Sequence, residues 1–256
     1  MTCASQFRWV SSARSDVGRV REHNEDACLQ QPERACWAVA DGMGGHSVGD
    51  LASGLIVDAL SRPSAPDNLA RCLADASERL LSVNQRLRDE AARRQVSVIG
   101  STVVALFACD SYCGYLWAGD SRLYLCRQGH LQQLTRDHSQ VEELKALGLL
   151  TEEEAINHPA QHLITRAVGA TDQLELDSNT MAVADGDVFL LCSDGLSNEL
   201  SAQEMQVALT VADCDVACNA LIEAALARGG RDNITAVVIR AEDTYATDKT
   251  LLNPAP

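Results

Sequence analysis

The chain has 256 residues, of which 46% are hydrophobic and 22% are charged, so it is long and apolar enough to bury the core of a globular protein. Its formal net charge at pH 7 is −15. This excess of carboxylates disfavours proteins that bind nucleic-acid phosphates or the anionic surface of a membrane.

The N-terminal part of the chain predicts two short strands followed by two helices. Apolar runs at residues 7–13 and 36–40 are typical of strands. A helix is expected over residues 47–60, before the proline-containing loop SRPSAPD. Residues 68–94 carry leucine and alanine at helical spacing with charges between them, which predicts a long amphipathic helix.

The middle of the chain changes to strand-like spacing. Residues 101–135 contain apolar runs joined by the tight turns CDSYC, AGDS and RQGH, which predicts an antiparallel meander. Residues 139–172 combine short helical stretches, several glutamates and a proline, and we interpret them as an insertion or flap between strands. Residues 174–192 return to strand character.

Two helices and a strand complete the predicted elements. The helices are expected at 201–210 and 214–227 and the strand at 233–240, while residues 241–256 have little pattern and are expected to form a mobile tail. Because strands and helices occur in blocks, the predicted fold class is α+β with antiparallel sheets.

The ten cysteines include no C-x-x-C pair, and several lie in apolar runs, such as Cys109, Cys126 and Cys192. We interpret them as small buried hydrophobes in a reducing compartment. The first residues lack the apolar core of a secretion signal, and the apolar stretches are shorter than a membrane span. A cytoplasmic protein is therefore expected.

Four aspartates stand at the ends of apolar strands. Asp41 follows the run at 36–40, Asp120 and Asp194 follow two later runs, and Asp232 directly precedes the last strand. One Asp-Gly pair alone usually forms a turn. Four converging carboxylates, however, would repel one another unless a divalent cation neutralised them. Ligands that are all oxygens favour Mg²⁺ or Mn²⁺ over Zn²⁺.

Further candidate residues surround this predicted metal site. The glycines after Asp41 allow a tight turn, and the carbonyl of Gly42 is a candidate ligand. The segment SDVGRVREHNEDA adds the carboxylate pair Glu25 and Asp26, with Arg21 four residues before Glu25. On its own this segment would be an ordinary charged loop. Beside a divalent site, the planar guanidinium of Arg21 is suited to bind a phosphate through two hydrogen bonds.

Eight segments of the chain resemble, in order, the motifs of the metal-dependent protein phosphatases, known as the PPM family or protein phosphatase type 2C. They cover about residues 9–240 and read SDVGRVREHNEDA, VADGMGGH, GSTVV, WAGDSRLYL, LTRDHS, LITRAVG, LLCSDGLS and GGRDNITAVVI. The form DGMGGH resembles the bacterial branch. The resemblance implies an αββα sandwich of two antiparallel sheets flanked by helices, with metals at one edge. Residues 1–240 would then form a single phosphatase domain, with a flap at about 139–172.

The same resemblance implies a ligand set for two tightly bound Mn²⁺ or Mg²⁺ ions. Asp41 would bridge the two ions, and the carbonyl of Gly42 would bind the second. Asp194 and Asp232 would hold the first. No metal position of the family is replaced in this chain.

The remaining motif residues take supporting roles by resemblance. Glu25 and Asp26 match positions that support the metal-bound waters, and Arg21 matches the phosphate-binding arginine. Asp120 matches a position that, together with Asp194, holds a third and weaker metal ion in bacterial members.

The implied activity is hydrolysis of phosphoserine and phosphothreonine in proteins by direct attack of a metal-bridging hydroxide. Arg21 and the metals would stabilise the developing charge. Because the hydroxide attacks phosphorus directly, no phosphoenzyme is needed. His46 is the nearest candidate for protonating the leaving oxygen, although a histidine after two glycines could equally position the loop. The expected partners are phosphoproteins modified by a serine/threonine kinase, and the protein is expected to be a monomer.

Three alternatives remain open at this point. The segment CLQQPER, Cys28–Arg34, has the C-x5-R spacing of cysteine-dependent phosphatases, but Pro32 lacks an N–H and Glu33 would repel phosphate. A catalytically silent phosphatase-like domain could instead bind and regulate a partner, although the complete set of carboxylates argues against it. A metal-dependent nuclease or nucleotidase would share the two-metal chemistry, but the chain shows no basic groove.

Overall fold

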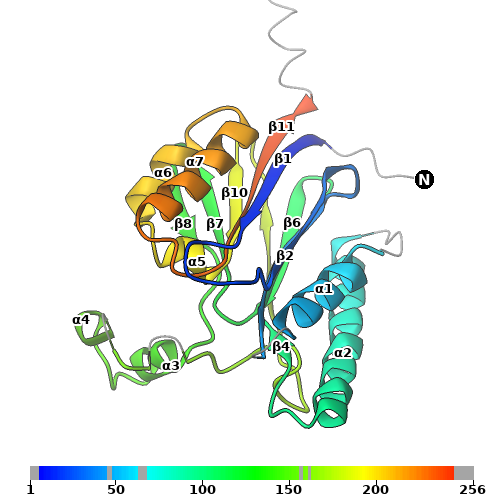
Figure 1. The fold of residues 1–256 in the computed structure, drawn as a ribbon. Coiled ribbons are helices and arrows are strands. Elements are labelled where there is room, and N and C mark those ends of the chain that lie inside the picture. The colour runs from blue at the N-terminus through cyan, green and yellow to red at the C-terminus, as the bar shows by residue number, and fades with distance from the viewer. Residues whose placement is uncertain (1–5, 45–47, 63–67, 156–157, 161–162, 245–256) are drawn as a thin grey trace, which may run out of the picture.

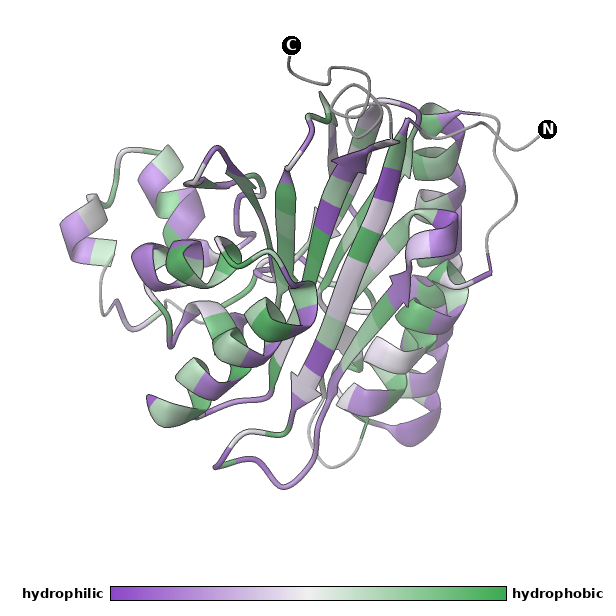
Figure 2. Ribbon diagram, turned by 90° about the horizontal axis from the view of Figure 1, so that it is seen from above, coloured by the Kyte–Doolittle hydropathy of each residue, from purple (hydrophilic) through white to green (hydrophobic). Residues whose placement is uncertain are grey.

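A computed structural model describes residues 6–44, 48–62, 68–155, 158–160 and 163–244 of the chain. Two antiparallel sheets pack face to face, with helices on the outer side of each (Figure 1). Figure 2 shows the same layers from above, with hydrophobic residues along the strands that lie between the helices. The prediction of an α+β sandwich of two antiparallel sheets flanked by helices is confirmed.

The first sheet places the first and last described strands side by side. Its strands in spatial order are β1 (Phe7–Asp16), β11 (Ile234–Asp243), β10 (Val188–Cys192), β7 (Arg122–Arg127) and β8 (His130–Gln133). β1 and β11 pair along their whole length. This pairing joins segments that are more than two hundred residues apart in the sequence.

The second sheet carries the strand that ends near Asp41. Its strands in spatial order are β2 (Asp26–Gln31), β3 (Cys36–Met43), β5 (Val103–Cys109), β6 (Tyr112–Ala118) and β9 (Asp177–Ala182), while the short β4 (Gly100–Ser101) pairs with the end of β3. All of these pairs are antiparallel.

The layer between the two sheets is rich in aromatic side chains. The Trp9 ring centroid lies 5.3 Å from that of Trp37 and 6.3 Å from that of Phe189, so the two sheets meet through these rings. Alternate residues of β3 face opposite sides: Trp37 and Val39 join this inner layer, whereas Ala38 packs toward the helices. Burial of β3 on both faces explains why its apolar run is unbroken.

Helices form the outer layers. The second sheet is covered by α1 (Gly49–Leu60) and α2 (Leu69–Arg94), and the first by α6 (Ala202–Leu209) and α7 (Cys214–Ala227) together with the single turn α5 (Asp194–Ser197). A further single turn, Pro32–Arg34, connects β2 and β3. α3 (Gln140–Ala146) and α4 (Glu152–Ala155) stand away from the sandwich (Figure 1), within the segment predicted to be a flap. Among the described residues, no helix combines the length and apolar character needed to cross a bilayer.

The prediction of one continuous meander over residues 101–135 is wrong. β5 pairs with β6 and β7 with β8, but β6 and β7 belong to different sheets. The chain crosses between the sheets at Gly119, whose φ of +110° and close approach to the Thr102 side chain leave no room for a Cβ. Local spacing does not distinguish such a crossing from a hairpin turn. The crossing brings Asp120 to the edge between the two sheets.

Some strands are longer than predicted, because pairing with a neighbouring strand extends them beyond their apolar run. β1 continues to Asp16 because Arg14–Asp16 pair with Ile234–Ala236, and β11 continues to Asp243 because Ala241–Asp243 pair with Phe7–Trp9. The segment Asp26–Gln31, not predicted as a strand, forms β2 because it pairs with β3 along its length. Residues 241–243 therefore belong to the sheet, and the rest of the predicted tail, beyond residue 244, lies outside the described residues.

Candidate metal centre

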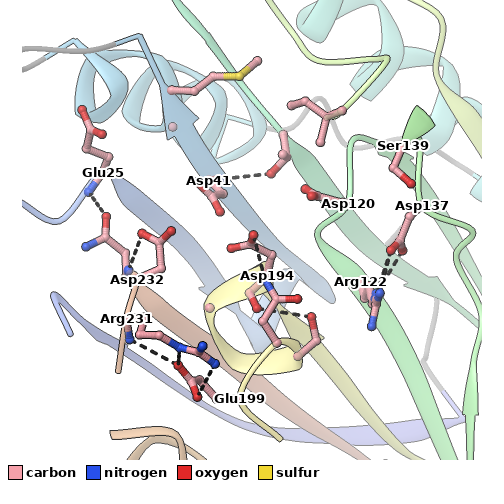
Figure 3. A pocket seen from close by; sticks show the side chains of 18 of the residues that line it. Glu25, Asp41, Asp120, Arg122, Asp137, Ser139, Asp194, Glu199, Arg231 and Asp232 are labelled. Atoms are coloured by element: carbon pink, nitrogen blue, oxygen red, sulfur yellow. Dashed lines mark hydrogen bonds and ion pairs between the residues drawn. The ribbon is translucent and has the colours of Figure 1, made fainter. Parts of the chain in front are cut away.

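One open pocket of about 970 Å³ lies where strands of both sheets end (Figure 3). Its lining includes seven of the residues singled out from the sequence: Arg21, Glu25, Asp41, Gly42, Asp120, Asp194 and Asp232. Figure 3 shows the carboxylates of Asp41, Asp120 and Asp194 directed into the same space. The predicted convergence of strand-end aspartates is therefore what the structure contains.

Backbone and hydroxyl contacts fix the position of Asp41. Its N–H donates to Thr102 Oγ1 at 3.1 Å, and its carbonyl oxygen accepts from the Thr102 N–H at 2.9 Å. Thr102 Oγ1 and Ser121 Oγ lie 2.7 Å apart in a buried hydrogen bond. Since Ser121 follows Asp120, this hydroxyl pair links the two loops that carry Asp41 and Asp120.

Asp26 lies beneath the pocket, opposite Asp41 in the β2–β3 register. Its Oδ2 accepts hydrogen bonds from Ser193 Oγ at 2.7 Å and Thr235 Oγ1 at 2.6 Å. Among the described residues, its buried Oδ1 has no hydrogen-bond partner. A buried carboxylate oxygen without a donor is costly, so this atom is suited to accept from a water or lie toward a cation.

The loops that carry Asp194 and Asp232 pack tightly against each other. A Cβ on Gly195 would lie 2.0 Å from the carbonyl oxygen of Asn233, so only glycine fits after Asp194. Asn233 in turn accepts from the Glu25 N–H at 2.8 Å through Oδ1, and its Nδ2 donates to the carbonyls of Val17 and His23, both at 2.9 Å. Asn233 thereby holds the loop that carries Glu25 against the start of β11.

The glycine after Asp41 serves a close approach of two backbones. A Cβ on Gly42 would lie 2.1 Å from the carbonyl oxygen of Gly49 at the start of α1. The Gly42 N–H donates to the Glu25 carbonyl oxygen at 3.1 Å, and Glu25 Oε1 accepts from the Gly49 N–H at 3.1 Å. Gly42, Gly49 and Glu25 therefore form one compact unit beside Asp41.

Burial and mutual repulsion raise the pKa values of three clustered aspartates. Burial is the largest cause for Asp26, whose pKa is raised to about 7 although two hydroxyl hydrogen bonds oppose the shift. Burial, followed by the charges of Asp194 and Asp137, raises the pKa of Asp120 to about 7. Burial and then the charge of Asp26 hold the pKa of Asp41 well above its usual range. A bound divalent cation relieves such repulsion.

Arg21, the phosphate-binding candidate from the sequence, lies at the edge of this cluster. Its Nη2 donates to Asp232 Oδ2 at 2.7 Å, and its side chain is about half exposed at the pocket. The hydrogen bond and charge of Asp232 raise the pKa of Arg21 above its ordinary value. Arg21 is therefore a permanent positive charge at the pocket, with further N–H groups for a second partner.

The cluster fits divalent cations by the chemistry of its donors. The side-chain atoms that it offers to a cation are carboxylate oxygens, which suit Mg²⁺ or Mn²⁺. The unpartnered Oδ1 of Asp26 and the raised pKa values of Asp26 and Asp41 indicate that protein groups alone do not balance the charge of the cluster. Within the described residues, no three His, Cys, Asp or Glu side chains form a ready-made metal group, and Asp232 is instead paired with Arg21. Small side-chain rotations would therefore accompany metal binding.

Two other sequence hypotheses have different outcomes. His46 lies outside the described residues, so its role as a proton donor stays a prediction. Cys28 lies within β2, paired with Val39, rather than in a loop around phosphate. Burial, followed by the charge of Asp26, raises the pKa of its thiol, whereas a nucleophilic cysteine needs a lowered pKa. The cysteine-phosphatase alternative is therefore not supported.

Two ion pairs at the pocket were missed from the sequence. Arg122 donates to both oxygens of Asp137, at 2.7 Å from Nη2 to Oδ2. Arg231 donates to both oxygens of Glu199, at 2.8 Å from Nε to Oε1. Each pair joins residues far enough apart that sequence spacing gives no signal. The segment predicted to be a flap also contributes to the lining, through Ser139, Val141, Glu142 and Ile164.

Comparisons with known proteins identify relatives of this chain. The family model for protein phosphatase 2C matches residues 18–227. The structure of PppA, described as a key regulatory component of T6SS in Pseudomonas aeruginosa, shares 45% identity with a TM-score of 0.85, covering 91% of this chain and 97% of that one. The catalytic domain of serine threonine protein phosphatase PstP, in complex with 2 manganese ions, shares 34% identity with a TM-score of 0.82, covering 93% and 100%. The serine/threonine phosphatase stp of Listeria monocytogenes serovar 1/2a is 35% identical over 241 residues, 90% of this chain and 95% of that protein.

Proposed function

The chain belongs to the protein phosphatase 2C family, and on that premise we propose that its pocket hydrolyses phosphoserine and phosphothreonine in proteins with the help of divalent cations. One observation carries the proposal. Aspartates from the ends of strands in both sheets meet in a single pocket, where burial and neighbouring charges raise the pKa values of Asp41 and Asp120. An arrangement so unfavourable for the protein alone is accounted for by cations that bind there.

We assign Asp41, Asp194 and Asp232, with the carbonyl of Gly42, to two tightly bound Mn²⁺ or Mg²⁺ ions. Asp120 would share a third and weaker ion with Asp194. Support comes from the position of all five residues in the pocket lining and from the two manganese ions named for the PstP relative.

The cations, when bound, would neutralise phosphate oxygens and lower the pKa of water enough for it to attack phosphorus near neutral pH. Thr102 and Ser121 hold Asp41 at a fixed position, which keeps the ligand set preorganised. Glu25 and Asp26 would accept hydrogen bonds from water in the cluster. Asp26 is suited to this role because one of its oxygens is buried without a partner among the described residues.

Arg21 would bind the phosphate group of the substrate. Its side chain is about half exposed at the pocket beside Asp232, so the guanidinium lies next to the cluster where substrate would arrive. Its remaining N–H groups can donate to two phosphate oxygens at once. The same contact would stabilise the charge that develops on these oxygens during transfer.

The substrates we propose are proteins phosphorylated by a serine/threonine kinase. Because such kinases need ATP, we propose that the enzyme acts in the cytoplasm and takes part in bacterial signalling. We also propose that it acts as a monomer. The similarity to PppA makes the phosphoproteins of a secretion system one group to test. Neither nucleic acid nor membrane is a proposed partner, because the chain carries a net charge of −15.

A catalytically silent regulatory domain is the less favoured alternative. Such a domain would have no need to keep every carboxylate of the cluster in one pocket, at the cost of mutual repulsion. A nuclease is disfavoured by the same acidic net charge.

The direct test is release of inorganic phosphate from a phosphothreonine peptide by the metal-stripped protein after addition of Mn²⁺. We expect turnover that saturates with Mn²⁺ and disappears when a chelator is added. Absence of turnover at every Mn²⁺ concentration, by a protein that remains folded, would favour the silent domain.

A further inference from the structure

Arginines gather on one side of the pocket although the whole chain is strongly acidic. The two loops around Arg21 and Arg231 lie side by side, because the Arg19 N–H donates to the Gly230 carbonyl oxygen at 2.7 Å. Arg21 and Arg231 both line the pocket. Arg21 is bonded to the candidate metal ligand Asp232, but Arg231 is bonded to no member of the metal cluster.

Glu199 holds the side chain of Arg231 in place. Nε and Nη2 of Arg231 donate to Glu199 Oε1 and Oε2, at 2.8 and 3.2 Å, and the Arg231 backbone N–H donates to Oε1 at 3.3 Å. The Glu199 side chain is only 4% exposed, whereas the Arg231 side chain is 71% exposed. Figure 3 shows the pair beside Asp232. The buried carboxylate thus supports a guanidinium that faces solvent at the pocket.

The geometry of this pair leaves Arg231 able to bind a second anion. Contacts through Nε and Nη2 occupy one edge of the planar group, and a guanidinium has five N–H donors in all. Because Glu199 already fixes the side chain, little further rotamer entropy is lost when another partner binds.

A phosphoprotein segment that brings its phosphate to Arg21 and the metal cluster must place its neighbouring residues along the pocket. Arg231 directly precedes Asp232 in the chain, so it lies next to the cluster but outside it. We propose that Arg231 forms an anion-binding subsite. This subsite selects substrates that carry a second anionic group, a carboxylate or another phosphate, close to the reacting phosphoresidue. This inference rests on the proposed phosphatase function.

The test compares phosphothreonine peptides that differ only beside the phosphothreonine. The flanking residues are alanine, glutamate, phosphoserine or lysine, placed in turn on either side, and kcat/KM is measured for each at saturating Mn²⁺. For the unmodified enzyme we expect the glutamate or phosphoserine peptides to be preferred over the alanine peptide by about fivefold, the size of an exposed charge pair. The two acidic peptides distinguish a carboxylate from a second phosphate as the favoured group.

Arg231→Gln is the informative variant, and Arg228→Gln is its matched control. Arg228 comes from the same loop, pairs with Glu204 and donates to the Glu199 backbone carbonyl oxygen at 3.4 Å, so it shares the surroundings of Arg231 but does not line the pocket. We expect the ratio of acidic to neutral peptide to fall toward one in Arg231→Gln, mainly through KM, and to stay unchanged in Arg228→Gln. Arg231→Lys should keep part of the preference, because the charge remains while the bidentate contact with Glu199 is lost.

Ionic strength provides a readout that a purely structural Arg231–Glu199 pair would not move. The preference of the unmodified enzyme should weaken at about 1 M salt, where charges are screened beyond roughly 3 Å. An equal rate for acidic and neutral peptides, or a preference that survives in Arg231→Gln, would overturn the subsite. Failure to hydrolyse even the small substrate p-nitrophenyl phosphate with Mn²⁺ would instead overturn the proposed phosphatase function, and the subsite with it.

Discussion

Asp26 of β2 lies directly opposite Asp41 of β3 in an antiparallel pair, so two carboxylates occupy adjacent positions at the end of one sheet. Like charges in such positions destabilise a sheet. The protein lessens the repulsion with hydrogen bonds from Ser193 and Thr235 to one oxygen of Asp26, and it leaves the other oxygen buried without a partner among the described residues. The pair is thus an unfavourable contact that bound cations would turn into a favourable one.

The metal-free protein should lose stability as the pH rises from about 4 to about 7. Asp26 and Asp120 have folded-state pKa values of about 7, against an ordinary value of 3.8. In this window the folded protein therefore binds more protons than the unfolded chain, and the free energy of unfolding falls as these protons leave. Thermal unfolding in chelator between pH 5 and 7.5 measures the effect.

Asp41→Asn is the control for this pH dependence, because it removes one repelling charge from the cluster. His138, whose pKa is lowered chiefly by burial, acts in the opposite sense in the lower part of this range and is present in both proteins. The variant should therefore show a shallower loss of stability between pH 5 and 7.5 than the unmodified protein. Equal pH dependence in the two proteins would contradict the repulsion described here.

Arg21→Ala should weaken substrate binding more than it slows the chemical step. The guanidinium contacts the phosphate in the ground state as well as in the transition state, so KM should rise roughly tenfold with a smaller fall in kcat. Arg19→Ala is the matched control, because Arg19 is exposed on the same loop but bonds to the Leu226 carbonyl and does not line the pocket. Steady-state kinetics on one phosphopeptide compare the two, and unchanged constants in Arg21→Ala would mark it as a surface charge.

Asp120→Asn should separate tight metal binding from turnover. Asp120 reaches the pocket from the crossing between the sheets, whereas Asp41 lies in β3, Asp194 begins α5 and Asp232 precedes β11. The variant should still bind two Mn²⁺ ions tightly in calorimetry, while phosphopeptide turnover drops about tenfold or more because a third ion is lost. Loss of one tight ion would make Asp120 a principal ligand, and full turnover would make it only a turn residue.

Cys28→Ser should leave phosphatase activity nearly unchanged. Cys28 lies in β2, and burial followed by the charge of Asp26 raises the pKa of its thiol, which disfavours the thiolate. Phosphate release before and after thiol alkylation offers an independent check. An inactive Cys28→Ser protein with an unchanged melting temperature would revive the cysteine-dependent mechanism.

The sequence was most informative where a strand ends on a charged residue. An apolar run predicts a buried strand, so a charged residue beside it marks where that strand begins or ends. Four aspartates stand beside such runs: Asp41, Asp120, Asp194 and Asp232. Helix α7 was also predicted to the residue, because its capping Asp213 and its regular spacing are local signals. These features depend on neighbours in sequence, so they can be derived before the structure is known.

The remaining features depend on partners that are distant in sequence. β6 and β7 flank one short turn but lie in different sheets, because β6 pairs with β9 and β7 pairs with β10. The ion pair of Arg231 with Glu199 and the hydroxyl contact of Thr102 with Ser121 bridge separate segments in the same way. No spacing rule relates such residues, and only packing of the two sheets brings them together.

Calorimetric titration of the metal-stripped protein with Mn²⁺ measures whether the aspartate cluster is a metal site. The unmodified protein is predicted to bind two Mn²⁺ ions tightly, and Asp41→Asn is predicted to lose the tight binding of at least one while remaining folded. Absence of tight Mn²⁺ binding by the unmodified protein, or two equally tight ions in Asp41→Asn, would contradict the account.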